Sequence, residues 1–66
     1  MSDRFTHAEM AHEMDRMASS KGGWLSTFSA GKKKRPDHEI EAQRLHLRVL
    51  RQAADDYRRA AERDAA

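Results

Sequence analysis

The sequence has no cysteine, a single proline and no long run of apolar residues. The absence of cysteine excludes disulfides and thiolate metal sites, and it is typical of proteins in a reducing compartment. The first residues, Met1 to Arg4, lead into a polar segment rather than a hydrophobic signal region. The sequence therefore supports neither secretion nor a membrane-spanning segment, and we expect a cytoplasmic protein.

A chain of 66 residues forms one small domain at most. Domains of this size bury only roughly 60% of the surface that their unfolded chains expose, so their stability is marginal without an additional constraint. Since disulfides and thiolate metal centres are excluded, oligomerisation is the expected source of that extra stability. We therefore treat residues 1–66 as a single domain.

β-Branched and aromatic residues are also few, and they never alternate with polar residues over a useful length, as a strand would require. Charged residues make up 36% of the chain and the mean hydropathy is −1.03, values that lean toward disorder. The net charge is only +2, however, and the apolar residues recur periodically. This periodicity favours folded helices, and the predicted fold class is all-α.

A first, short helix is predicted over residues 7–20. Thr6 and Glu9 have the spacing of a capping box, in which each side chain accepts a hydrogen bond from the backbone amide of the other. Three methionines then recur one or two turns apart and give this helix one apolar side: Met10, Met14 and Met17.

This helix is expected to end near Lys21, because Gly22 and Gly23 offer a residue that can take the left-handed conformation of a helix C-terminus. Residues 22–36 would then form an unusually long connection. Its last part, residues 29–36, is predicted to be a flexible basic loop. Three large apolar side chains before this loop are expected either to anchor the connection on the helices or to contact a partner: Trp24, Leu25 and Phe28.

A second, long helix is predicted over residues 38–63, with Asp37 as its N-cap after Pro36. Along it, one set of residues recurs at alternating intervals of three and four, and we call this set the seam: Ile40, Gln43, Leu47, Leu50, Ala54, Tyr57 and Ala61. A seam of this length requires a facing helix. Gln43 is its polar member, and it either fixes the register of an interface or is hydrated at the interface edge.

The two predicted helices differ in length, roughly 21 Å against roughly 39 Å, at about 1.5 Å per residue. If the first helix folds back on the second, it covers only one half of the seam, which we take to be the half from Ile40 to Leu50. Leu45 and Val49 lie well away from the seam, so the second helix is apolar on two sides. We therefore expect a helix-loop-helix hairpin that dimerises into a helical bundle, parallel or antiparallel, or docks on a larger protein through the seam.

Basic residues are concentrated in the loop and continue along one side of the second helix: Lys32, Lys33, Lys34, Arg35, Arg44, Arg48 and Arg51. Cations next to Trp24 and Phe28 are what phosphate neutralisation and base stacking would require. The same run is also typical of a solvated loop, a nuclear-import signal or a patch that contacts anionic lipid. Nucleic-acid association is therefore the alternative function.

No cluster of residues indicates catalysis or a cofactor. Glu9 and His12 have the spacing of ligands in di-iron bundles, but both lie off the methionine side and Glu9 is already assigned to the capping box. The serines have no activating base at a recognisable spacing, and no glycine pattern forms a phosphate loop. We expect no metal, no cofactor and no enzymatic activity. The predicted function is a protein-protein interaction module, regulatory or adaptor in type, that docks or dimerises through the long second helix.

Overall fold

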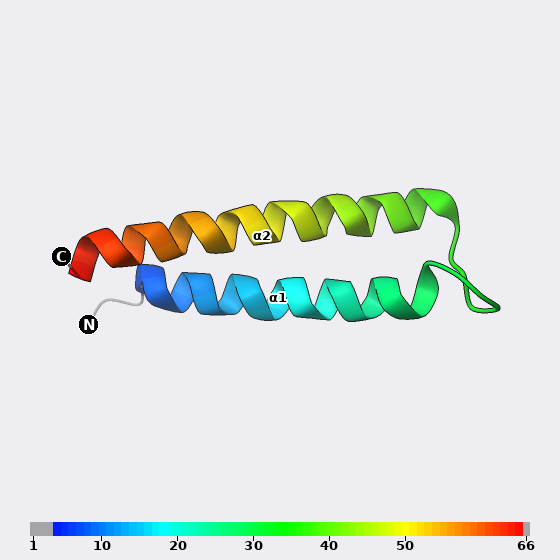
Figure 1. The fold of residues 1–66 in the computed structure, drawn as a ribbon, viewed down its shortest axis with the longest axis horizontal. Helices are drawn as coiled ribbons and strands as arrows, with labels where there is room; N and C mark the ends of the chain where they lie inside the picture. The colour runs from blue at the N-terminus through cyan, green and yellow to red at the C-terminus, as the bar shows by residue number, and fades with distance from the viewer. Residues whose placement is uncertain (1–3, 66) are drawn as a thin grey trace.

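A computed structural model describes residues 4–65, and it consists of two antiparallel helices joined by a loop (Figure 1). Helix α1 spans His7–Phe28 and helix α2 spans Asp37–Ala65. The hairpin is elongated, with extents of 49 × 23 × 15 Å. The start of α1 and the end of α2 lie at the same end of the molecule, and the loop lies at the other. The prediction of an all-α hairpin is confirmed.

Helix α1 begins with the predicted capping box. The Thr6 hydroxyl accepts from the backbone amide of Glu9 at 3.0 Å, and the Glu9 carboxylate accepts from the backbone amide of Thr6 at 2.9 Å. Both amides would otherwise lack a partner at the helix N-terminus. The Thr6 hydrogen bonds also lower the pKa of Glu9 below its ordinary value, because they favour the ionised carboxylate.

The prediction that α1 ends near residue 20 is wrong, because the helix continues to Phe28. Gly22 and Gly23 lie inside it, and neither adopts a positive φ. A glycine in a helix interior costs only about 1 kcal/mol relative to alanine. The apolar residues that follow, Trp24, Leu25 and Phe28, are half-buried, and burial of their large side chains outweighs that cost.

The connection is correspondingly shorter than predicted and comprises residues 29–36. The left-handed residue is Gly31, with φ 82°, and not one of the earlier pair. The Arg35 amide donates to the Phe28 carbonyl at 2.8 Å and closes the loop across its base. Asp37, predicted to be the N-cap, is instead the first residue of α2, because the helical hydrogen bonds start at the Pro36 carbonyl.

The core is thin and lies between the two helices. The buried apolar residues are Ala11, Ala18, Ile40 and Ala54, with exposed fractions between 1% and 7%. Three of the four are alanines, which allow close approach of the helix backbones. Among residues 4–65, no buried side chain is larger than that of Ile40.

Candidate interaction surface

The seam of α2 faces α1. Ile40 and Ala54 are buried, and the other seam residues are all half-buried. The two helices share one long line of contact (Figure 1). The seam's facing helix is therefore α1 of the same chain.

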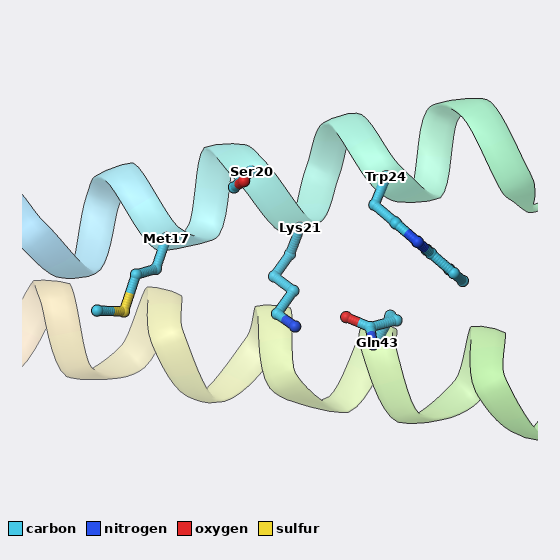
Figure 2. Close-up of a pocket in the computed structure, with 5 residues that line it drawn as sticks. All are labelled: Met17, Ser20, Lys21, Trp24 and Gln43. Carbon is cyan, nitrogen blue, oxygen red and sulfur yellow. The ribbon is translucent and has the colours of Figure 1, made fainter.

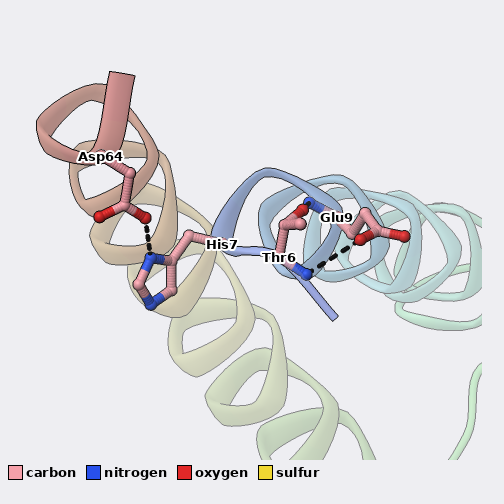
Figure 3. A network of polar contacts seen from close by, with 4 residues as sticks. All are labelled: Thr6, His7, Glu9 and Asp64. Atoms are coloured by element: carbon pink, nitrogen blue, oxygen red, sulfur yellow. Dashed lines mark hydrogen bonds and ion pairs between the residues drawn. The ribbon is translucent and has the colours of Figure 1, made fainter. Parts of the chain in front are cut away.

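The prediction that the first helix covers only the half of the seam from Ile40 to Leu50 is wrong. The start of α1 reaches the end of α2, where His7 donates to the Asp64 carboxylate (Figure 3). The His7 ring also stacks on Tyr57 with 6.1 Å between ring centroids. Because α1 is eight residues longer than predicted, it runs beside nearly the whole of α2.

One broad side of the hairpin carries large side chains that the seam contact leaves partly uncovered. In each helix these residues recur every seven positions, close to two helical turns, and we call them together the Met-Trp face: Met10, Met17 and Trp24 of α1 with Gln43, Leu50 and Tyr57 of α2. Met17 is 49% exposed and the other five are half-buried.

Two hollows lie along this face. Met17, Trp24 and Gln43 line one together with Ser20 and Lys21. Figure 2 shows Met17, Lys21 and Trp24 reaching from α1 toward α2, with Gln43 next to them on α2. Met10 and Tyr57 line the other hollow, together with Arg4, Phe5 and His7.

Sequence reasoning missed the Met-Trp face because it ended the first helix before Trp24. The signal that could have found it is the spacing Met10, Met17, Trp24, which continues the methionine pattern across the glycine pair. The Trp24 ring also packs on Phe28 one turn later, with 5.2 Å between ring centroids.

A second apolar surface lies on α2 away from the seam. Leu45 and Val49 are 51% and 57% exposed and lie one helical turn apart. We call these two residues the outer pair. Val49 lines a shallow hollow with Gln52, Ala53 and Asp56. Their exposure is large for branched aliphatic side chains that lie side by side.

The basic loop is partly neutralised by the start of α2. Lys34 lies 3.0 Å from the Asp37 carboxylate, and Arg35 donates to both carboxylate oxygens of Glu39 at 2.8 and 3.1 Å. The hydrogen bond from Lys34 lowers the pKa of Asp37, and the one from Arg35 lowers the pKa of Glu39. Two of the four loop cations are thus paired with acids of the same chain, and the other two, Lys32 and Lys33, are exposed.

Only some arginines of α2 are paired with carboxylates. Arg58 donates to Asp15 of α1 at 2.7 Å, and Arg59 pairs with Asp55 at 2.8 Å. By contrast, three exposed arginines, which we call the arginine row, form no ion pair within residues 4–65: Arg44, Arg48 and Arg51. Their spacing places the row on the side of α2 that carries Arg58, across the seam from the Met-Trp face.

Within the described residues 4–65, no three histidine or carboxylate side chains are close enough together to hold a metal ion. Glu9, one of the two residues with metal-ligand spacing, is engaged in the capping box. Neither helix, over the part of the chain that the structure describes, is long and apolar enough to cross a membrane.

Comparison with known proteins identifies no relative of this chain. No protein-family model, no curated protein and no solved structure matches the chain. Its function must therefore be argued from its own surfaces.

Proposed function

We propose that the chain is a small, non-enzymatic helical module of the cytoplasm that binds other proteins, as a regulatory or adaptor protein. The observation that supports this most is the outer pair on α2. Leu45 and Val49 are more than half exposed, one turn apart, on the long helix that was predicted to dock. Adjacent aliphatic side chains on a helix surface are what a hydrophobic groove of a partner protein takes up.

The thin core supports the same proposal. A two-helix hairpin has one line of contact, and here that line buries mainly alanines. Most large apolar side chains of residues 4–65 are only half-buried or are exposed, and a further protein layer would remove them from water. Burial of apolar surface is the main favourable term in protein association.

The second candidate is nucleic-acid association, and the arginine row is the observation that favours it. These three guanidinium groups are exposed and form no close ion pair within residues 4–65, and they extend over about 10 Å of helix. Such a row fits the phosphates of a nucleic-acid backbone. The loop offers less positive charge to phosphates than the sequence indicates, because Lys34 and Arg35 are paired with Asp37 and Glu39.

A capture experiment with tagged protein separates the two candidates. The variant L45D/V49D places two carboxylates on the outer pair, and we expect it to lose a protein that the wild type retains. The matched variant R48D/R51D also adds two carboxylates to exposed sites of α2, and we expect it to retain that protein. Both variants should keep wild-type helicity, because all four positions are exposed.

Loss of the captured protein from both variants, or from neither, would contradict docking through the outer pair. Capture of a nucleic acid that L45D/V49D retains and R48D/R51D loses would favour the second candidate. Such binding should also weaken steeply as salt is raised, since it depends on the release of counterions from phosphates.

A further inference from the structure

The Met-Trp face is built in three levels. Met10 lies beside Tyr57 at one level and Trp24 beside Gln43 at another, as the two hollows show. Met17 and Leu50 lie midway between these residues in each helix, so in antiparallel helices they form the level between. A strict seven-residue repeat on both helices is the pattern of the inner layers of a four-helix bundle.

The face is symmetric about its central level on α1. Met10 and Trp24 lie seven residues on either side of Met17, and Glu13 and Lys21 lie four residues on either side. In a two-fold dimer, residue i of one copy meets residue j of the other and the reverse also holds. An antiparallel second α1 centred on Met17 would therefore bring each Met10 to a Trp24 and each Glu13 to a Lys21. Sulfur-aromatic contact and opposite charge make both pairings favourable.

The two-fold symmetry that pairs α1 with a second α1 also makes α2 self-complementary. Gln43 and Tyr57 lie seven residues on either side of Leu50. A second α2 centred on Leu50 would bring the Gln43 amide to the Tyr57 hydroxyl of the other copy, and these two groups can form a hydrogen bond. The polar residue of the seam would then have a partner, as buried polar residues in bundle layers require.

Charge distinguishes this face from the opposite broad side. The opposite side carries charges of both signs, but an antiparallel copy centred on the same level would bring Arg48 of each chain close to Arg51 of the other at the centre of the contact. Like charges across an interface are repulsive. On the Met-Trp face the two charged residues at symmetric positions, Glu13 and Lys21, have opposite signs. Glu13 also contacts Arg16 at 3.5 Å within its own helix, an exposed pair that leaves its carboxylate accessible.

We infer that the Met-Trp face binds a second copy of this chain, and that the two hairpins form an antiparallel four-helix bundle whose two-fold axis passes through the level of Met17 and Leu50. Each helix then has antiparallel neighbours, and the thin core of one hairpin becomes part of a thicker shared core. This inference goes beyond the proposed function, because the outer pair lies off this face and stays available to another protein.

Sedimentation of the purified full chain tests the inference. We expect a dimer at micromolar concentration, and we expect Met17→Lys to raise its dissociation constant about 100-fold or more, because two lysines would be buried at the centre. Leu45→Lys is the matched control, since Leu45 is 51% exposed and Met17 49%. It should leave the dimer intact. Both variants should keep wild-type helicity, since neither side chain is buried within the hairpin.

A charge exchange tests the geometry of the dimer. Glu13→Lys places four lysines near one another across the two copies, and Lys21→Glu does the same with carboxylates. Each should weaken the dimer about tenfold, and the combined variant should return it to near the wild-type constant, because the opposite-sign pairing is restored. A structural effect on the single hairpin would not be reversed in this way.

A wild-type monomer at high micromolar concentration would overturn the inference, as would equal dissociation by Met17→Lys and Leu45→Lys. A dimer that the combined charge variant fails to restore would overturn the two-fold arrangement. A monomeric wild type would leave the outer pair's capture experiment unaffected, because that experiment uses variants off the Met-Trp face, whereas dissociation by Leu45→Lys would place the outer pair in the dimer contact. The failure of the dimer and the failure of the proposed function are therefore distinguishable.

Discussion

At the scale of single residues, the three glycines have different roles. Gly22 and Gly23 are helical residues of α1, and a methyl group added to either would meet no atom within 4 Å apart from the neighbouring backbone of its own helix. Gly31 has φ 82°, a conformation that residues with a side chain rarely adopt. The first two are therefore helix-weakening positions, whereas the third is required by the turn.

We predict opposite effects of alanine at these positions. Gly22→Ala and Gly23→Ala should each raise the free energy of unfolding by up to about 1 kcal/mol, because alanine favours the helix and restricts the unfolded chain. Gly31→Ala should lower it by about 1 kcal/mol, since a left-handed alanine is strained. Urea denaturation followed by circular dichroism measures all three. Destabilisation by alanine at the glycine pair would contradict a helix that continues to Phe28.

At the scale of elements, the sequence predicted helix starts better than helix ends. The start of α1 rests on local contacts between Thr6 and Glu9, and these form as expected. The predicted end of α1 is wrong because the low helix propensity of glycine is a weak local effect. The half-burial of Trp24, Leu25 and Phe28 beside α2 overrides it. That burial depends on a distant helix and could not be derived from the glycine pair itself.

The error in the predicted end of α1 also affected the prediction of the interaction site. A short α1 leaves the half of the seam beyond Leu50 without an intrachain partner, and this is why the sequence predicts dimerisation or docking through the seam. In the structure α1 reaches this half, through His7 with Tyr57 and Asp64. The outer pair, which depends only on the periodicity of α2, was recognised from the sequence as a second apolar side and is exposed.

Three carboxylates at the helix starts predict how the hairpin responds to acid. Hydrogen bonds lower the pKa of Glu9, Asp37 and Glu39 in the folded chain from ordinary values of 4.5, 3.8 and 4.5. Their stabilising contribution is therefore fully present above the ordinary values and is lost as pH falls through the lowered folded values. The melting temperature should be constant between about pH 7 and pH 5 and should fall below about pH 4.

The variant E9Q/D37N/E39Q provides the control, because it removes the three titrating groups while keeping side chains of similar size. Its melting temperature should depend less on acid than that of the wild type. An unchanged pH profile would contradict the assignment of the acid response to these three carboxylates.

At the scale of the whole molecule, the stability of the hairpin depends on the single contact between α1 and α2. Two helices can enclose only the residues between them, and among residues 4–65 the buried set holds a single large side chain, Ile40, at 4% exposure. The other large apolar residues of the described chain, residues 4–65, are half-buried or exposed. A stability near 0.1 kcal/mol per residue would give a chain of 66 residues only about 7 kcal/mol in total.

We therefore predict that Ile40→Ala removes a large share of the stability of the hairpin. Truncation of a buried isoleucine costs about 2–5 kcal/mol, through lost burial and the cavity left behind. Val49→Ala is the control, because Val49 is also β-branched and lies on the same helix but is 57% exposed. It should change the free energy of unfolding by less than about 0.5 kcal/mol, as surface substitutions usually do. Urea denaturation of both variants at the same protein concentration makes the comparison. Equal losses would mean that Val49 is covered in solution, and would assign the outer pair to the folded core of an assembly rather than to a docking surface.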